Sequence, residues 1–207
     1  MKPYTQLPPF YAQWGEDRWL AENLAIPAQG TFVDVGAGDG VHGSNSLYFE
    51  NLGWSGLAVE ADPRNAHALQ KRRCAVRMCA VARSPGRQQF GLHTHKSWSG
   101  LTQRGPEVEV IAVDCFRLAD LLGPLGLQTV DLLSIDVEGT ELDVWDSIDH
   151  TTTTCRLIII EFDDKRPDRA RHQIHRHLGI GVYDLIHESA ANLIFERKDR
   201  RWPRRVT

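Results

Sequence analysis

Short apolar runs alternate with longer polar or amphipathic segments along most of this chain. The runs lie at 31–35, 57–60, 75–80, 130–135 and 157–160. The last of them is apolar throughout, which is typical of a strand buried on both faces of a parallel sheet. The pattern therefore predicts an α/β fold, in which helices cover both faces of a mostly parallel sheet.

The remaining segments complete this prediction. We expect helices at 16–24, 44–52, 62–72, 115–122, 140–148 and 167–178. The runs at 183–187 and 192–196 predict a C-terminal hairpin, which adds an antiparallel edge pair and brings the sheet to seven strands. Two short strands are predicted at 88–92 and 107–113. The polar segment 91–105 lies between them and carries Trp98, so we expect it to be a substrate-facing loop.

The length of 207 residues fits one domain with a substantial core. We expect an N-terminal arm of residues 1–25 packed on the sheet, a main domain of residues 26–197 and a basic tail of residues 198–207. The tail has one aromatic residue among its arginines, and we expect it to be solvated.

The charge and composition of the chain argue against several classes of function. The formal net charge of -3 gives no overall attraction to nucleic acid or to an anionic membrane. No apolar run approaches the about 20 residues needed to cross a bilayer, and the first residues lack a signal-peptide core. The four cysteines are scattered, as in reduced thiols rather than a disulfide framework. We therefore expect a cytoplasmic protein.

The strand at 31–35 runs directly into a turn with alternating glycines, Gly36, Gly38 and Gly40. The next predicted strand ends at Glu60. Glycines let the backbone turn tightly and approach a ligand, and an acid at the end of the second strand can accept hydrogen bonds from ribose hydroxyls. This pairing predicts a nucleoside-binding site.

Spacing and charge favour one nucleoside ligand. A dinucleotide fingerprint needs a third glycine three residues after the second, and Val41 stands there instead. Asp34 stands two residues before the first glycine and Asp39 lies inside the turn, and two carboxylates would repel a pyrophosphate. S-adenosylmethionine, which carries a sulfonium and an ammonium and no phosphate, fits these acids better. A nicotinamide or flavin cofactor, and a glycine turn without a ligand, remain open.

Ligands of open α/β sheets bind at the carboxyl ends of the strands. We expect Asp34 and the glycine turn to hold the methionine part of the cofactor, Glu60 to hold the ribose, and Ala80 and Val81 to flank the adenine. The predicted cofactor contacts at these strand ends are Asp34, Gly36, Ala37, Gly38, Gly40, Glu60, Ala61, Ala80, Val81 and Asp136.

Asp136 and Glu138 follow the fourth predicted strand of the main sheet and are the candidate catalytic residues. A carboxylate there can orient an acceptor hydroxyl or take its proton. Asp136 with Glu161 or Asp163 could instead hold a Mg²⁺ ion. In a purely structural interpretation, Asp136 caps a helix and Glu138 is a favourable acid in its first turn. His187, at the end of a late strand, is a further candidate base.

Several of these motifs together resemble the FkbM-type S-adenosylmethionine-dependent methyltransferases. The specific ones are Ile135-Asp136-Val137-Glu138-Gly139 and Gly53-Trp54-Ser55-Gly56-Leu57. The other matching segments are 13–17, 32–40, 44–46, 80–82, 99–101 and 131–134, within a resemblance that spans about 13–163.

The resemblance implies a Rossmann-like class I methyltransferase fold and O-methylation of a hydroxyl. It also implies that Gln13, Glu16, Asp17 and Asn45 line the cofactor or substrate pocket. This chain is short and shows no separate substrate domain. We therefore expect the arm, the 91–105 loop with Trp98, and a partner subunit in a homodimer to recognise the acceptor.

These observations predict a methyltransferase that acts on a hydroxyl of a saccharide or small natural product. A nicotinamide-dependent oxidoreductase is disfavoured by the acids around the glycine turn. Two further functions stay open, a non-catalytic S-adenosylmethionine-binding module and an RNA methyltransferase that uses the basic tail.

Overall fold

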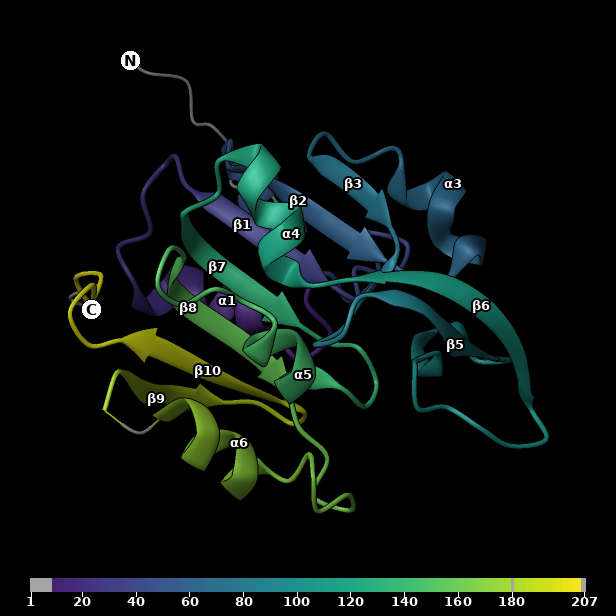
Figure 1. Ribbon diagram of the computed structural model, residues 1–207. Helices are drawn as coiled ribbons and strands as arrows, with labels where there is room; N and C mark the ends of the chain where they lie inside the picture. Colours follow the sequence, from purple (N-terminus) through teal and green to yellow (C-terminus); the bar gives the residue numbers. More distant parts are fainter. Residues whose placement is uncertain (1–8, 180, 206–207) are drawn as a thin grey trace.

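The computed structural model describes residues 9–179 and 181–205. Its main sheet has seven strands in the order β3-β2-β1-β7-β8-β10-β9 (Figure 1). In that order the strands are Ala75–Met78, Ser55–Glu60, Thr31–Val35, Thr129–Ile135, Thr154–Glu161, Asn192–Arg197 and Tyr183–Glu188. The first five are parallel, whereas β10 is antiparallel to both β8 and β9. The predicted sheet and its C-terminal hairpin are confirmed.

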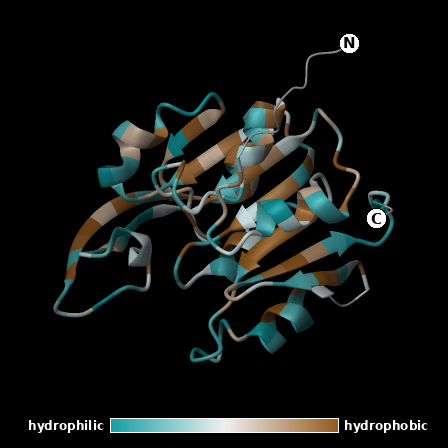
Figure 2. Cartoon of the chain, turned by 180° about the vertical axis from the view of Figure 1, so that it is seen from behind, coloured by the Kyte–Doolittle hydropathy of each residue, from teal (hydrophilic) through white to brown (hydrophobic). Residues whose placement is uncertain are grey.

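Strand residues alternate between two hydrophobic cores, because successive side chains point to opposite faces of a sheet. Val33 and Ile158 belong to one core, and their neighbours Phe32 and Ile159 belong to the other. The central strands are accordingly the hydrophobic part of the chain (Figure 2). α4 (Leu118–Leu122), α5 (Glu141–Asp146) and α6 (Arg171–Gly179) contribute to the first core, and α1 (Glu16–Asn23) and α2 (Leu47–Leu52) to the second. Among the described residues, no helix is both long and apolar enough to cross a membrane.

The arm and the tail meet on one face of the sheet. Leu20 of α1 and Trp202 of the tail are buried in the same core. The amide of Ala25 donates to the carbonyl of Pro203 at 2.8 Å, and Arg204 pairs with the buried Glu196 at 2.6 Å. The expectation of a solvated tail is wrong for this part, because an indole and a buried carboxylate hold it to the domain. Residues 1–8 and 206–207 lie outside the described residues.

A second, three-stranded sheet has the order β4-β6-β5. It consists of β4 (Ala80–Val81), β5 (Gly86–His93) and β6 (Val108–Phe116). The predicted strands at 88–92 and 107–113 are confirmed as β5 and β6, whereas the hydropathy pattern does not predict their pairing in a separate sheet. The predicted strand 75–80 is divided, because Ala80 pairs with β6 instead of continuing along the main sheet. Cys115 lies in β6 and not in a helix, since it packs against Phe90 and neighbouring apolar residues.

Helix boundaries also differ from the prediction. The expected helix at 62–72 consists of two short pieces, η1 (Pro63–Asn65) and α3 (Ala66–Leu69). The expected helix at 167–178 begins only at α6, since the residues before it form turns. The polar loop of the second sheet contains η2 (Lys96–Trp98), and η3 (Gly123–Leu125) follows α4.

Candidate functional site

A cavity of about 340 Å³ opens at the carboxyl ends of β1, β2, β4 and β7. This is where an open α/β sheet binds its ligand. Of the predicted site residues, the cavity wall contains Gln13, Asp34, Gly36, Ala37, Gly38, Asn45, Glu60, Ala61, Ala80, Val81, Asp136 and Glu138. Segments far apart in the sequence therefore converge as the strand-end argument predicts.

The glycine turn is packed tightly between the neighbouring strands. The amides of Gly36 and Ala37 both donate to the carbonyl of Val59, at 2.9 and 3.0 Å. Gly36 has φ +85°, and a Cβ atom placed on it would lie 1.7 Å from the carbonyl oxygen of Asp136. Only glycine fits there, because the turn crosses directly against the end of β7.

We expect Gly36→Ala to destabilise the protein severely and to abolish ligand binding in the cavity. The substitution combines left-handed backbone strain of about 1–2 kcal/mol with a clash against main chain that cannot move aside. Gly38→Ala is the matched control, since Gly38 also has positive φ but a Cβ on it would meet nothing within 4 Å. Urea unfolding of both variants measures the difference, and equal losses of stability would contradict the steric argument.

Glu60 is 7% exposed and is held by main-chain amides. Its Oε2 accepts from the amide of Gly38 at 2.7 Å, and its Oε1 accepts from the amide of Asp62 at 2.6 Å. Burial raises the pKa of Glu60 to about 7, against the lowering effect of these two amides. The carboxylate is therefore fixed in orientation at the end of β2, on the cavity wall.

Asp34 and Asn45 form a buried polar group beside the glycine turn. The hydroxyl of Ser46 donates to Asp34 at 2.5 Å, and Arg72 donates to the same hydroxyl oxygen at 3.0 Å. Burial raises the pKa of Asp34. Asn45 donates to the hydroxyl of Ser134 at 3.1 Å, while its Oδ1 has no hydrogen-bond partner among the described residues. A buried acceptor without a partner is costly unless a ligand supplies the donor.

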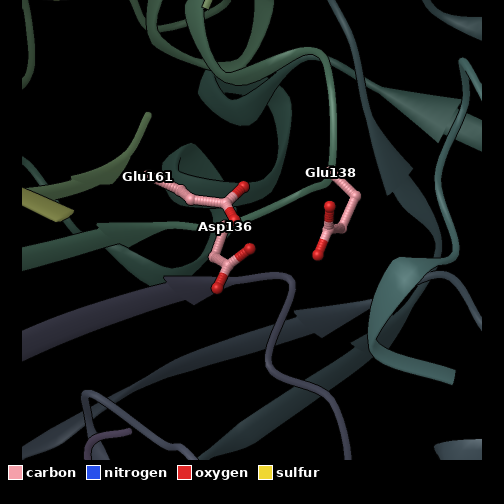
Figure 3. A group of neighbouring side chains, drawn as sticks. All are labelled: Asp136, Glu138 and Glu161. Carbon is pink, nitrogen blue, oxygen red and sulfur yellow. The ribbon is translucent and has the colours of Figure 1, made fainter. Parts of the chain in front are cut away.

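Three carboxylates, Asp136, Glu138 and Glu161, lie close together (Figure 3). Asp136 and Glu138 line the cavity, whereas Glu161 lies outside its wall. One carboxylate oxygen of each residue lies within 4.8 Å of those of the other two. Burial, followed by repulsion from neighbouring carboxylates, raises the pKa of Asp136 to about 7 and that of Glu138 to about 8. The same causes raise the pKa of Glu161 to about 10. The values for Asp136 and Glu138 are typical of groups that exchange protons near neutral pH.

Glu138 has an unusual backbone. Its φ is +59°, the single positive value among the described non-glycine residues. The side-chain amide of Gln103 donates to the Glu138 carbonyl at 2.8 Å. A Cβ on Gly100 would lie 3.1 Å from that carbonyl oxygen, so the loop of the second sheet packs closely against Glu138. A strained backbone held by surrounding contacts is common at functional sites.

Arg169 is a residue beside this site that the sequence prediction missed. It is 4% exposed, and its Nη2 donates to Glu161 and, at 3.0 Å, to Glu141. Its Nη1 lies 3.9 Å from Glu138 Oε2. A lone arginine in a polar segment carries no local signal of such a role, because only the tertiary fold places it behind the carboxylates.

In their present arrangement, Asp136, Glu138 and Glu161 do not form a suitable Mg²⁺ site. Three converging oxygens suit a hard cation, but the Arg169 guanidinium already binds Glu161 and lies beside Glu138. A metal ion bound by Asp136 and Glu161 would compete with this guanidinium for the Glu161 carboxylate. The predicted Mg²⁺ therefore gains no support from the site, and no chemical step is assigned to it.

Other predicted residues lie outside the cavity wall. Glu16 is fully buried and accepts from Asn192 at 2.8 Å, and Asp17 accepts from the amide of Tyr11 at 2.6 Å. Both carboxylates therefore hold the arm in place, and their predicted substrate contact gains no support. His187 stacks on Trp19 with ring centroids 4.3 Å apart. Gly40 lies against Leu69 instead of facing the cavity.

The 91–105 loop does reach the cavity, although through other residues than Trp98. His95, Lys96, Ser97 and Ser99 are part of the wall. Trp98 is 53% exposed and stacks on His95 at 5.0 Å between ring centroids. Arg64 anchors this loop by donating to the carbonyl of His93 at 2.9 Å and to the hydroxyl of Ser99 at 3.0 Å.

Several solved structures of methyltransferases are similar to this chain. They include the precorrin-6Y C5,15-methyltransferase of Geobacter metallireducens GS-15, which is 14% identical with a TM-score of 0.48, over 94% of this chain and 93% of that one. A TehB-like SAM-dependent methyltransferase of Corynebacterium glutamicum ATCC 13032 is 12% identical with a TM-score of 0.43, over 90% and 89%. The glycopeptide N-methyltransferase MtfA, solved with sinefungin, is 14% identical with a TM-score of 0.41, over 93% and 89%.

No sequence among the curated proteins matches this chain. The family model for the methyltransferase FkbM domain matches residues 34–181. This range includes the glycine turn, Glu60 and the clustered carboxylates of Asp136, Glu138 and Glu161. This match covers most of the chain and confirms the resemblance drawn from its motifs. The chain therefore belongs to the FkbM family of S-adenosylmethionine-dependent methyltransferases.

Proposed function

We propose that this protein transfers the methyl group of S-adenosylmethionine to a hydroxyl oxygen of a saccharide or small natural product, with Glu138 as the general base. The observation that carries the proposal is the position of Glu138. Its carboxylate lies on the wall of the cofactor cavity, beside the end of β7, and has a pKa of about 8. A base of this strength suits the removal of a hydroxyl proton near neutral pH.

The residues of the wall divide between cofactor and acceptor. In this proposal Glu60 binds the ribose hydroxyls, Ala80 and Val81 flank the adenine, and Asp34 with Asn45 faces the methionine part. The unpartnered Oδ1 of Asn45 supports this arrangement, because the ammonium of the cofactor is a strong donor. Asp136 lies between the two parts and would orient the methyl donor or the acceptor.

The reaction is an in-line displacement. As the acceptor oxygen forms a bond to the methyl carbon, the bond from that carbon to sulfur breaks and S-adenosylhomocysteine leaves as a neutral thioether. The hydroxyl proton passes to the Glu138 carboxylate. Much of the acceleration comes from holding the two reactants in line.

One observation supports a sugar-like acceptor, and a second argues against RNA. The exposed ring of Trp98 offers an apolar face at the edge of the site, against which the C–H face of a sugar can pack. The basic tail offers less free charge than its composition suggests, because Lys198 and Arg201 pair with Asp184 and Arg204 pairs with Glu196. A homodimer and a cytoplasmic location stay predictions.

The test is methyl transfer from isotope-labelled S-adenosylmethionine to panels of glycans and polyketide-type alcohols, with EDTA and with Mg²⁺ in parallel. We expect a product labelled on oxygen, at a rate that rises with pH through about 8 as Glu138 ionises. A product labelled on nitrogen or carbon would contradict the O-methylation proposal. Binding of S-adenosylhomocysteine without any transfer would favour a non-catalytic module, and transfer to RNA would favour an RNA methyltransferase.

A further inference from the structure

The Arg169 side chain faces a group of carboxylates in the protein interior. Its Nε lies 2.9 Å from Glu141 Oε2, and its Nη2 donates to Glu141 Oε1 at 3.0 Å and also to Glu161. The main chain fixes the residue as well, since the Arg169 amide donates to the carbonyl of Arg166 at 3.0 Å. A planar guanidinium held on several sides has little freedom to move.

The guanidinium reaches Glu138 from behind the cavity wall. Its Nη1 lies 3.9 Å from Glu138 Oε2. Arg169 does not line the cavity, whereas Glu138 does. The fixed positive charge therefore lies on the protein side of the Glu138 carboxylate.

The Glu138 carboxylate needs a nearby cation, because other carboxylates surround it. The described charged groups that act on Glu138 are Asp136, Glu141, Glu161 and Asp163, together with Arg169. Arg166 approaches the adjoining main chain at Gly139. Four carboxylates so close would favour protonation of one another, and Arg169 is the cation that binds several of them at once.

We infer that Arg169 is a positioning residue, which uses Glu141 and Glu161 as a fixed frame and thereby orients the Glu138 carboxylate and favours its charged form. Gln103 complements it by holding the Glu138 main chain at the carbonyl. The inference rests on the proposed role of Glu138 as the base. It assigns a function to a residue that does not line the cavity.

The experiment compares Arg169→Met and Arg169→Lys with Arg171→Met. Arg171 is a matched control, because it is a nearby arginine that pairs with Asp164 and Glu188 on the surface. We expect Arg169→Met to lower kcat about 10- to 100-fold, with the KM for S-adenosylmethionine and the affinity for S-adenosylhomocysteine changed less than about threefold. The acidic limb of the pH–rate profile should move to higher pH, because Glu138 loses a stabilising cation. Arg169→Lys should recover part of the rate, and Arg171→Met should match the wild type.

A second measurement needs neither turnover nor a variant of Arg169. In the ¹⁵N spectrum of the arginine side chains, the Arg169 guanidinium should give a signal protected from exchange, and Glu138→Gln should shift it. If no acceptor is methylated and this shift is seen, the proposed function fails and the coupling of Arg169 to Glu138 stands. If the signal does not respond, or if folded Arg169→Met keeps the wild-type kcat and pH profile, the inference is wrong.

Discussion

Replacing Glu138 with glutamine should lower kcat by about 10²- to 10⁴-fold, the range that a general base contributes, while S-adenosylhomocysteine still binds. The variant keeps the shape of the side chain and its contact with the cavity, but it cannot accept the hydroxyl proton. Its backbone at φ +59° is also held by Gln103, independently of the side-chain charge. Single-turnover methyl transfer and calorimetric titration with S-adenosylhomocysteine together measure this separation of rate from binding.

The control is Glu22→Gln, which changes an exposed glutamate of α1. It should leave both rate and affinity unchanged. A Glu138→Gln protein that turns over within about threefold of the wild type would contradict the role of Glu138 as the base. A protein that loses cofactor affinity to the same extent as rate would identify Glu138 as part of the binding site instead.

The Asp136→Asn variant distinguishes the role of Asp136 from that of Glu138. Asp136 accompanies Glu138 in the same loop and also lines the cavity, so we expect this variant to lose turnover with S-adenosylmethionine still bound. If binding falls equally, Asp136 serves the cofactor or the fold. The main-chain carbonyl of Asp136 already touches the glycine turn, so its backbone position is structural in either case.

The parts of the fold that the sequence predicts are those with a strong local pattern. β8 is predictable because Leu157–Ile160 has no polar interruption, and the glycine turn is predictable because its spacing is almost independent of the rest of the chain. The convergence of Asp34, Glu60 and Asp136 on one cavity follows from a topological rule for parallel sheets. These predictions need no knowledge of side-chain packing.

The remaining parts depend on contacts between distant segments. Glu16 looks like an accessible acid in the sequence, but the fold places it against Asn192, 176 residues away. Trp202 belongs to a basic tail, yet it packs against Trp54, with ring centroids 5.8 Å apart. Arg169 acquires its role only when β8 and α5 bring Glu161 and Glu141 to it. Charge and hydropathy along the chain cannot distinguish such residues from solvated ones.

Replacing Glu60 with alanine should weaken the binding of S-adenosylhomocysteine by about 10- to 100-fold. The carboxylate is positioned by the amides of Gly38 and Asp62, and charge-assisted hydrogen bonds to the ribose hydroxyls contribute about 1.5–3 kcal/mol. Glu60→Gln should lie between the wild type and Glu60→Ala, because one amide oxygen still accepts. Glu22→Gln again serves as the control, and an unchanged affinity in Glu60→Ala would place the ribose elsewhere.

The pH dependence of the Glu60 variants provides an independent check of the same assignment. The free protein holds Glu60 with a pKa of about 7, raised from 4.5 by burial. Hydroxyl donors of the ligand favour the ionised form, so wild-type affinity should increase from pH 6 to pH 8, and Glu60→Gln should lack this increase. The free energy of unfolding changes with pH in the opposite direction from the affinity. A raised pKa gives a contribution that is complete below pH 4.5 and is lost as pH rises through about 7, so the wild type should lose stability relative to Glu60→Gln over that window. Affinity that increases with pH together with stability that decreases would trace both effects to one buried carboxylate. A flat stability profile would show that Glu60 is ionised throughout, and a flat affinity profile beside a sloping stability profile would show that Glu60 does not bind the ribose.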